Sequence, residues 1–407
     1  MAGAVRSLRD GDLRLMDAPW PCWIEVDLDA IRHNVRQIRA LVHPRCEVMA
    51  VVKSHGYGHG AVPVARAALE AGATWLGVAR VREGVQLRNA GVEAPILLLG
   101  PFHEGEVRAI AEHQLQPTVI SIEQARMVSA AAQAAGRDVL IHLKVDTGLG
   151  RYGAPLQAIR DLVPRLLELP GVRVEGLYSH FATADEPDSV HAADQLKAFL
   201  AGRAELESEG YRFRITHIAA SAGTLGVNGS HLDMVRVGLS LYGLYPSPHL
   251  VPRASLRPAL SFHSRVARVF RVDPGQSVGY GRTFVASEPT IAALIPVGYA
   301  DGLPRSHSNR GAVLVNGHRA PLIGRVSMDQ CVANVSECGS VREGDPVVLI
   351  GSQGGETISC DEFAERSGTV TYEVLTSLGF RVPRIYKSGG APVGVGFLDE
   401  GKLEVWP

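Results

Sequence analysis

Short apolar runs alternate with segments of helical periodicity from about residue 23 to residue 245. The run Glu47–Val52 is apolar at nearly every position, which is typical of a parallel strand buried on both faces. The next segment, Val62–Ala71, has helical spacing and ends at Gly72, a residue suited to the position after a helix. The cycle repeats, with helical segments that end at Gly91, Gly136, Gly171 and Gly210 and further expected strands at Trp75–Ala79, Ile96–Leu99, Pro117–Ile120, Val139–Val145, Val174–Ser179, Arg214–Ala219 and Asp233–Val237.

These runs make eight expected strands with helices between most of them. Eight strand–helix units in about 200–250 residues is the size of a (β/α)8 barrel, so we predict a TIM-type barrel of the α/β class. A doubly wound sheet is the alternative, because periodicity does not distinguish the two. One helix precedes the first strand: Asp29 is its expected N-cap, and Ile31, Val35, Ile38 and Leu41 repeat at helical spacing.

A proline-rich segment follows the predicted barrel. Residues 246–258 hold four prolines in thirteen positions, which indicates a linker. We therefore predict an N-terminal extension (1–22), a barrel domain (23–250) and a C-terminal, mostly β domain (255–407). The β domain holds one expected helix, Cys360–Arg366, capped by Ser359 or Asp361, and strand-like runs at Phe262–Val272, Thr290–Pro296, Ala312–Val315 and Pro346–Ile350.

Composition and charge exclude several classes of protein. Hydrophobic residues make up 46% of the chain and charged residues 20%, which predicts globular domains with sizeable cores. Lys plus Arg number 41 and Asp plus Glu 42, so the net charge is −1 and we expect no nucleic-acid partner. The five scattered cysteines form no C-x-x-C pair, which predicts neither a metal site nor a disulfide framework. Charged residues interrupt the first twenty positions and the apolar runs are short, so we expect a cytoplasmic protein with no membrane segment.

Several charged residues follow strands of the predicted barrel, at the rim where the active sites of such barrels lie. Lys53 ends the first strand beside a glycine-rich loop, and such a lysine can bind a carbonyl compound as a Schiff base; a surface lysine is the alternative. Lys144 and Asp146 lie on one side of the fifth strand by alternation, and Arg151 follows them. For Lys144 and Asp146 the segment alone favours a solvated salt bridge.

Other polar residues follow the last three expected strands. His180 ends the sixth, although a single histidine is more often structural. After the seventh, Ala219–Thr224 offers hydroxyls and backbone N–H groups that suit a phosphate. The eighth carries Arg236 and then Gly238, and the loops after strands seven and eight are the usual phosphate site of this fold. A phosphate-bearing aldehyde joined to Lys53 explains these signals, and pyridoxal 5′-phosphate (PLP) is such a molecule.

The motif Val51-Val52-Lys53 with Tyr57-Gly58-His59-Gly60 resembles the cofactor-lysine motif of bacterial alanine racemases. The resemblance runs in order from about Trp23 to Tyr386, through both predicted domains. It implies a PLP-dependent amino-acid racemase that interconverts L- and D-alanine. Further matching segments are 142–148 with Arg151, 179–184, 234–238, 278–281, 296–302, 324–330 and 372–375.

The resemblance also implies roles for individual residues. Lys53 would bind PLP and act as one catalytic base, and Tyr280 of the partner subunit would be the other, which implies a homodimer with shared active sites. Arg236 would face the pyridine nitrogen, and His180 would bridge Arg236 and Tyr280. Lys144 matches a position that is carbamylated in some members and then orients the neighbouring arginine. The phosphate would be held by Tyr57, Ser221, Gly238, Leu239 and Tyr372, the substrate carboxylate by Arg151 and the backbone of Met328, and Tyr299 would line the entry channel.

Racemisation itself requires two opposed groups. A proton must leave one face of the α-carbon and another must return to the opposite face, and one base does not easily reach both. Lysine and tyrosine have reference pKa values of about 10. Desolvation would favour neutral Lys53, and cationic donors behind Tyr280 would favour its phenolate. Arg236 keeps its proton, so the pyridine nitrogen would stay unprotonated and side reactions would be limited.

The chain departs from the family pattern at three places, which leaves its substrate range open. Ser54-His55-Gly56 stands where the family has Ala with Asp or Asn and then Ala, Ala220 replaces an asparagine, and Ser327 replaces a common cysteine. Side-chain polarity around a site selects the substrate, so a racemase of serine or other amino acids is the first alternative. A PLP-dependent decarboxylase and a non-catalytic cofactor carrier are the others; Arg236 argues against the former, and Tyr280 in the second domain against the latter.

Overall fold

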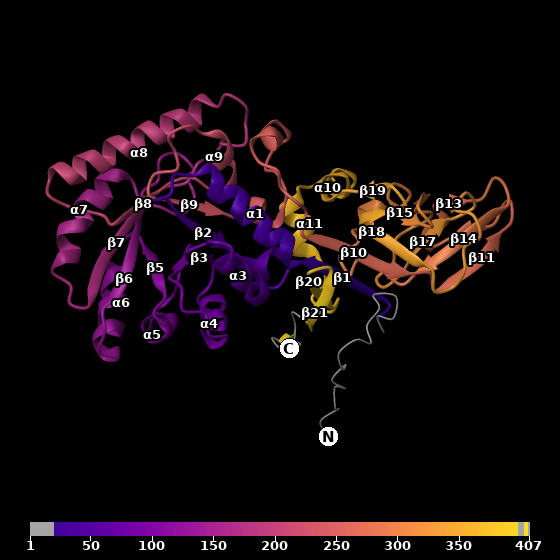
Figure 1. The fold of residues 1–407 in the computed structure, drawn as a ribbon, viewed down its shortest axis with the longest axis horizontal. Helices are drawn as coiled ribbons and strands as arrows, with labels where there is room; N and C mark the ends of the chain where they lie inside the picture. The colour runs from indigo at the N-terminus through magenta and orange to yellow at the C-terminus, as the bar shows by residue number, and fades with distance from the viewer. Residues whose placement is uncertain (1–19, 398–402, 406–407) are drawn as a thin grey trace, which may run out of the picture. The chain divides into compact units, whose positions relative to one another are not determined.

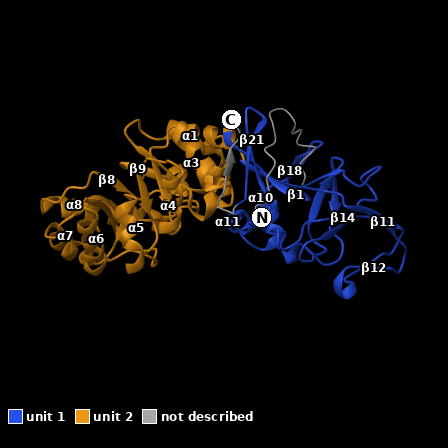
Figure 2. Cartoon of the chain, turned by 90° about the horizontal axis from the view of Figure 1, so that it is seen from below, with its two compact units in different colours: residues 1–28, 259–407 blue, residues 29–258 orange. Residues whose placement is uncertain are grey.

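The computed structural model describes residues 20–397 and 403–405, and these residues belong to two compact units (Figure 2). Unit 2 comprises residues 29–258, and unit 1 comprises residues 1–28 and 259–407. Most of the expected N-terminal extension, residues 1–19, lies outside the described residues.

Unit 2 contains the predicted parallel barrel (Figure 1). Its eight strands lie in the order β8-β7-β6-β5-β4-β3-β2-β9, and β9 pairs in parallel with β2. An isolated parallel bridge joins Ala220 to Arg236 between the two ends of this sheet, so the barrel is nearly closed and the doubly wound alternative is wrong. The strands are β2 (Glu47–Val51), β3 (Trp75–Val78), β4 (Ile96–Leu98), β5 (Gln116–Val119), β6 (Val139–Lys144), β7 (Val172–Tyr178), β8 (Ile215–His217) and β9 (Met234–Val237).

The helices between these strands end largely where the sequence predicts. Gly136 caps α6 in the left-handed conformation, with φ of +64°, which only glycine adopts without cost. The first helix begins at Leu28, so Asp29 lies in its first turn and the N-cap prediction was wrong. The helices are α1 (Leu28–Leu41), α2 (Lys53–Tyr57), α3 (Ala61–Glu70), α4 (Val81–Asn89), α5 (Val107–Glu112), α6 (Ile122–Ala135), α7 (Leu156–Leu167), α8 (Val190–Ser208) and α9 (Ser221–Gly226), with short 3-10 turns η2 (Glu104–Glu106), η3 (Leu239–Tyr242) and η4 (Pro248–Arg253).

The end of the proline-rich segment 246–258, which belongs to unit 2, is fixed against helix α1. The side chain of Asn34 on α1 is fully buried; it accepts the N–H of Arg257 at 2.8 Å and donates to the carbonyls of Arg257 and Leu241 at 2.9 and 3.1 Å. One buried amide therefore satisfies two backbone groups of this segment, both of Arg257, and one of η3, the carbonyl of Leu241.

Unit 1 is mostly β, as predicted. β1 pairs antiparallel with β10 and parallel with β20, because Ile24 and Val26 bury their side chains completely in this unit. The expected single run Phe262–Val272 is two strands, β10 and β11, that belong to different sheets. The main sheet has the order β16-β15-β18-β10-β1-β20-β21-β22 with β19 beside β18; a second sheet is β11-β14-β17 and a third is β12-β13. The strands are β1 (Cys22–Asp27), β10 (Leu260–Arg265), β11 (Arg268–Val272), β12 (Ser277–Val278), β13 (Phe284–Val285), β14 (Thr290–Ile295), β15 (Ala312–Val315), β16 (His318–Pro321), β17 (Cys331–Asn334), β18 (Pro346–Gln353), β19 (Glu356–Ile358), β20 (Arg384–Ser388), β21 (Ala391–Gly396) and β22 (Leu403–Val405).

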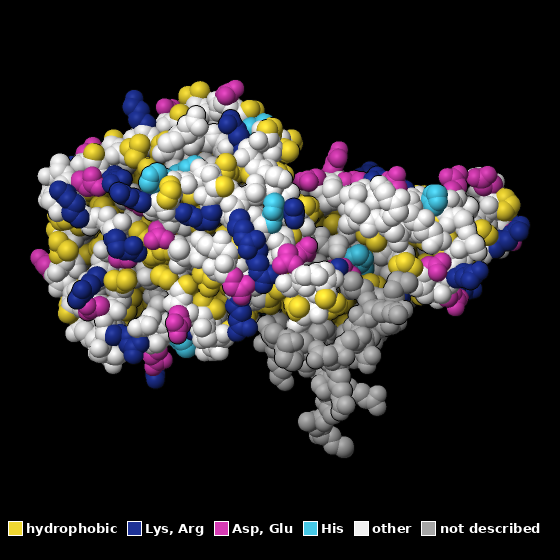
Figure 3. All heavy atoms as spheres, in the orientation of Figure 1, with side chains coloured by type: hydrophobic (Ala, Val, Ile, Leu, Met, Phe, Trp, Pro, Cys, Tyr) yellow, Lys and Arg dark blue, Asp and Glu magenta, His cyan; other side chains and the backbone are white. Residues whose placement is uncertain are grey.

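Two helices complete unit 1: α10 (Cys360–Ser367) and α11 (Thr371–Ser377), besides the 3-10 turns η5 (Tyr280–Arg282) and η6 (Arg305–His307). Ser359 is the N-cap of α10, since its hydroxyl accepts the N–H of Glu362 at 3.0 Å; of the two expected caps, Ser359 is therefore the right one. Basic and acidic side chains are interspersed over the face shown in Figure 3. No helix in the described part of the chain is both long enough and apolar enough to cross a membrane.

Candidate functional site

Lys53 opens the segment after β2, and this segment runs against the preferred handedness of the chain. Ser54, His55 and Tyr57 have φ of +53°, +55° and +51°, and Gly56 between them has +63°. Each non-glycine residue in this region costs about 1–2 kcal/mol. The left-handed turn 54–57 therefore persists because contacts with the rest of the barrel hold it.

Glu83, near the start of α4, supplies such contacts. One of its carboxylate oxygens accepts the N–H of Ser54 at 2.6 Å, and the other accepts the N–H groups of Ala79 and Arg80 at 2.7 and 2.9 Å. The carboxylate thus ties the turn after Lys53 to the residues after β3. Glu83 is not among the residues predicted from the sequence, although its place three residues after Arg80, where a helix begins, is that of a capping glutamate.

The environment of Lys53 favours the neutral amine. The side chain is half-buried, and burial lowers its pKa; the positive charge of Arg151 lowers it further, while Glu83 opposes the shift. A lowered pKa leaves a larger fraction of the lysine as the free amine, which is the form that attacks an aldehyde and that accepts a proton. Arg151 itself is exposed in the loop after β6.

Lys144 is buried at the end of β6, so the expected solvated salt bridge with Asp146 was wrong. Its ammonium nitrogen lies 5.6 Å from the ring centre of Tyr152 and 5.1 Å from that of Tyr178. The Asp146 carboxylate instead accepts the N–H groups of Gly148, Leu149 and Gly150 at 2.9–3.2 Å. Burial, followed by the charges of Arg236 and Arg151, lowers the pKa of Lys144 to about 7.

Arg236 on β9 is the most tightly held side chain of the rim. One terminal nitrogen, Nη2, donates to the carbonyls of Ser179 and Ile218, both at 2.9 Å, and lies 3.0 Å from Nδ1 of His180. The other, Nη1, lies 2.7 Å from Nδ1 of His217. Burial lowers the pKa of Arg236 to about 10, so the guanidinium remains charged at neutral pH, and its charge, after burial, lowers the pKa of His180.

Ser221, Gly238 and Tyr57 form a narrow corner near Arg236. The hydroxyl of Ser221 accepts the N–H groups of Gly238 and Ser240 at 3.0 and 3.2 Å. The hydroxyl of Tyr57 lies so close to Gly238 that a Cβ on this glycine would be 2.6 Å from it. Leu239 is buried at the start of η3 beside this corner. Hydroxyls and backbone N–H groups that converge without intervening side chains suit a phosphate.

We expect Gly238→Ala to weaken PLP binding about 5- to 100-fold, because the new methyl group would push Tyr57 from the corner. The backbone of Gly238 has φ of −107°, outside the left-handed region, so the expected cause is the contact of the new methyl group with Tyr57. Titration of the cofactor-free protein with PLP, followed by absorbance, gives the affinity. Gly105→Ala is the matched control, since nothing lies within 4 Å of its new Cβ. Equal affinities of the two variants for PLP would contradict the predicted phosphate site at this corner.

The remaining predicted residues lie in unit 1, and the structure brings two of them together. The N–H of Tyr299 donates to Ser327 at 3.0 Å and the N–H of Ala300 donates to Met328 at 3.0 Å, so the loops of Tyr299 and Met328 are paired. Tyr280 begins η5 with 72% of its side chain exposed. Large hydrophobic residues that are exposed in one unit are available to a second component. Besides Tyr280, three predicted residues of unit 1 are among them: Met328 (53%), Tyr299 (45%) and Tyr372 in α11 (39%).

Arg381 holds the two paired loops of unit 1 and was also missed. Its Nε donates to Asp301 at 2.8 Å and its Nη2 to Asp329 at 2.5 Å, and Asp301 accepts the N–H of Gly298 at 3.0 Å. The guanidinium thus connects the segment after Tyr299 to the segment after Met328. The signal in the sequence was weak, because all three charged residues are far apart along the chain.

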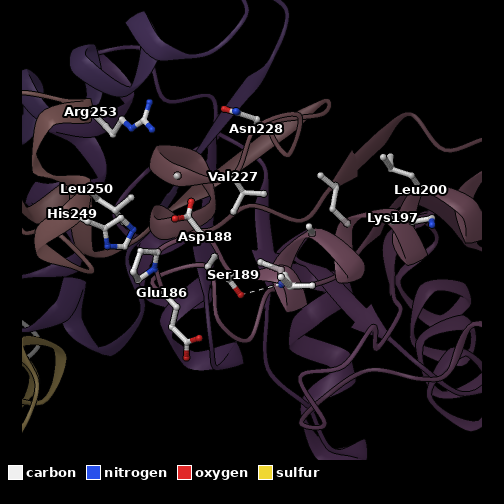
Figure 4. Close-up of a pocket in the computed structure, with 17 residues that line it drawn as sticks. Glu186, Asp188, Ser189, Lys197, Leu200, Val227, Asn228, His249, Leu250 and Arg253 are labelled. Atoms are coloured by element: carbon white, nitrogen blue, oxygen red, sulfur yellow. Dashed lines mark hydrogen bonds between the residues drawn. The ribbon is translucent and has the colours of Figure 1, made fainter.

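A separate hollow of about 930 Å³ lies in unit 2 between the start of α8 and η4 (Figure 4). Asp188, Lys197, Val227 and Arg253 are among its lining residues, as are Ser189 and Ala192, joined by the N-cap hydrogen bond of α8. Its lining includes none of the predicted site residues, so it is distinct from the rim described above. Within the part of the chain that the structure describes, no group of three His, Cys, Asp or Glu side chains is placed to hold a metal ion.

Comparison with known families matches both parts of the chain. Residues 26–246 match the family model "Alanine racemase, N-terminal domain", and residues 259–386 match "Alanine racemase, C-terminal domain". A curated alanine racemase of Desulfosudis oleivorans is 45% identical over 379 residues, which are 91% of this chain and 97% of the relative. One of a Nostoc species is 43% identical over 366 residues, 89% of this chain and 95% of the relative.

Solved structures agree with these sequence relatives. The alanine racemase of Bacillus anthracis with bound L-Ala-P has a TM-score of 0.89 at 39% identity, and the match covers 95% of this chain and all of that one. The alanine racemase of the D-cycloserine producer Streptomyces lavendulae has a TM-score of 0.87 at 41% identity, covering 92% and 98% of the two chains.

Proposed function

The chain belongs to the alanine racemase family, and we propose that it interconverts L- and D-alanine with PLP as cofactor. The observation that carries this proposal is the buried Arg236, fixed by four contacts on the rim that also carries Lys53 and the corner at Ser221 and Gly238. The decarboxylase and carrier alternatives are not favoured, because the C-terminal family model also matches.

The residues of the barrel fit PLP. Gly238 lets the hydroxyl of Tyr57 approach the main chain at the corner, because a Cβ at this position would lie 2.6 Å from that hydroxyl. Lys53 would hold the aldehyde carbon and Arg236 would face the pyridine nitrogen. Tyr57, Ser221, Gly238 and Leu239 of the barrel would hold the phosphate, together with Tyr372 of unit 1. When bound, the cofactor supplies an electron sink for the charge that develops at the substrate α-carbon.

The protein's own groups would move the protons. The Nζ of Lys53 would take the proton from the D-amino acid and return it on the same face. The Oη of Tyr280 of the partner subunit would serve the L-amino acid on the other face. His180, bonded to Arg236, would connect the guanidinium to that tyrosine. Because Arg236 is charged at neutral pH, it would donate to the pyridine nitrogen and leave it unprotonated.

The substrate would be held by its carboxylate. Arg151 and the backbone of Met328 would bind it, and Tyr299 would line the channel through which it enters. A racemisation assay of the purified protein with alanine, serine and lysine tests the function and its range. Turnover of alanine well above the other two is expected, and absence of racemisation of all three would overturn the proposal.

The subunit organisation is also a proposal: a homodimer in which the barrel domain of one chain and the β domain of the other complete each site. Support comes from the grouping of Tyr280, Tyr299, Met328 and Tyr372 in unit 1, with their side chains partly exposed. The cytoplasm is the proposed location, and all five cysteines are free and buried.

We expect activity to return when two inactive variants, Lys53→Ala and Tyr280→Phe, are mixed. Each heterodimer would contain one site with both native groups and one with neither, so a 1:1 mixture would recover about a quarter of the native rate. Mass-tagged subunits verify that exchange took place, and each variant incubated alone gives the baseline. Verified exchange without recovery would exclude shared sites.

We expect Lys144 to be carbamylated at pH 8 and to lose the group below pH 7. Only the neutral amine reacts with carbon dioxide, and a pKa of about 7 leaves much of Lys144 neutral at pH 8 and little of it at pH 6. Carbon-13 NMR of the native protein in labelled bicarbonate would show a carbamate signal that is absent from Lys144→Ala. A native protein without this signal at pH 8, or a crystal structure with a bare Lys144, would refute the expectation.

A further inference from the structure

A row of buried polar side chains crosses the barrel and ends at Arg236, and its other three members have no part in the proposed function. Gln116 on β5, His142 on β6, His217 on β8 and Arg236 on β9 have exposed fractions of 7%, 0%, 0% and 3%. Oε1 of Gln116 lies 3.1 Å from Nε2 of His142, whose Nδ1 lies 3.1 Å from Nε2 of His217. Nδ1 of His217 lies 2.7 Å from Nη1 of Arg236. Four strands thus contribute one continuous chain of hydrogen bonds.

The direction of every bond in this chain is determined by Arg236. A guanidinium only donates, so Nδ1 of His217 must accept and its proton must sit on Nε2. That proton can be donated only to Nδ1 of His142, which therefore carries its own proton on Nε2 and donates to Gln116. Protonating either imidazole would place two donors face to face.

The surroundings of both imidazoles also favour this neutral state. Burial lowers the pKa of His142 to about 3 and that of His217 well below its ordinary value; nearby arginines act in the same direction, Arg214 and Arg236 on His142 and Arg236 on His217. Glu175 pairs with Arg214, and further titratable side chains that face the hydrogen-bonded chain are Lys144, Tyr178 and His180, the last at 3.0 Å from Arg236.

The two rings are also fixed in position. Tyr178 stacks on His217 with ring centres 4.7 Å apart and planes 5° apart, and its hydroxyl is 2.7 Å from that of Thr118. The ring of His142 occupies the space beside Gly176 on β7, where a Cβ would lie 2.5 Å from Nδ1. The absence of a side chain at Gly176 therefore makes room for the ring of His142.

His217 is the hydrogen-bond acceptor on the Nη1 side of the Arg236 guanidinium. Nη2 has three partners, two of which are main-chain carbonyls, whereas His217 is the partner of Nη1 among the described residues. Loss of the imidazole would leave a buried N–H without an acceptor, and the guanidinium would turn to find one.

We propose that His217, held as its neutral Nε2-protonated tautomer by His142 and Gln116, is a positioning residue that sets the direction of the Arg236 guanidinium. The link to catalysis rests on the proposed function, in which that guanidinium meets the pyridine nitrogen. The tautomer and its partners do not depend on it, since all four side chains belong to the barrel.

The first experiment reads the tautomers in the protein without cofactor. Two-bond 1H–15N spectra of 15N-histidine protein, assigned with His217→Gln and His142→Gln, should show Nε2 protonated and Nδ1 bare in both residues. Neither should titrate between about pH 5.5 and 9. A proton on Nδ1 of His217, or titration in this range, would overturn the proposal, and no variant has to be active for that result.

The second experiment follows Arg236 in the loaded protein through the 15N shift of PLP labelled at the pyridine nitrogen. His217→Phe should move this shift and its pH dependence, and lower kcat/KM about 10- to 100-fold, because a hydrogen bond to a charged group is lost. His217→Gln should restore most of both, since its oxygen can accept from Arg236 and its amide can donate to His142.

Two further variants distinguish an effect on the position of His142 and His217 from a general loss of stability. Gly176→Ala keeps every polar atom but would displace His142, so it should move the pyridine shift in the same direction as His217→Phe. His307→Gln in unit 1 removes another buried histidine, bonded to Ser367 at 2.8 Å, and should leave the shift unchanged. An unmoved shift in both His217→Phe and Gly176→Ala would sink the inference while racemisation in the native protein keeps the proposed function.

Discussion

Lys53→Ala should lower the rate of racemisation to less than about one part in 10⁴ of the native rate. This is the largest effect that we expect of any single substitution. The variant removes the covalent attachment of the cofactor and one of the two acid–base groups, and an acid–base group by itself is typically worth about 10² to 10⁴ in rate. The left-handed turn after Lys53 is held by the Glu83 carboxylate, which accepts the main-chain N–H of Ser54. The Lys53 side chain takes no part in this bond, so the fold should not change.

The measurement is reduction with borohydride followed by peptide mapping. The native protein should carry a pyridoxyl group on Lys53, and Lys53→Ala should carry none while it still binds PLP weakly at the Ser221 corner. Lys197→Ala, an exposed lysine of α8, is the matched control and should behave as the native protein. A pyridoxyl group that remains at full occupancy in Lys53→Ala would disprove the role of this lysine.

Tyr280→Phe should lower the rate of racemisation about 10²- to 10⁴-fold. It should also make the rates of α-proton exchange of D- and L-alanine unequal. The substitution removes one oxygen from a side chain that is 72% exposed within its unit, so stability should hardly change. Lys53 can still remove and return the α-proton of D-alanine on its own face, whereas L-alanine has lost its base.

Deuterium incorporation from solvent, measured separately for D- and L-alanine, tests this asymmetry. We expect exchange into D-alanine to survive and exchange into L-alanine to fall with racemisation. Tyr211→Phe, in the barrel unit, is the control for loss of a phenol. Equal residual exchange from the two enantiomers would mean that one base reaches both faces, and the two-base proposal would have to be abandoned.

Two of the expectations that failed did so because of contacts with residues elsewhere in the chain. Lys144 is not solvated because the rings of Tyr152 and Tyr178, from a loop and from β7, close over it. Phe262–Val272 reads as one strand, yet it divides between two sheets, because β10 finds partners in β1 and β18 while β11 finds β14. Periodicity carries no information about which partner a strand will have.

The sequence by itself determined the eight parallel strands to within about two residues at most ends, and the placing of Lys53, Arg236 and the Ser221 loop at strand ends. These follow from local patterns: apolar runs set strands, and the order of a parallel barrel then sets its rim. Only the tertiary structure decided what surrounds these groups. Glu83 on the turn of Lys53, and His217 with His142 behind Arg236, come from separate strands and helices. Because burial and hydrogen-bond partners depend on those non-local neighbours, no local pattern could reveal which polar residues support the site.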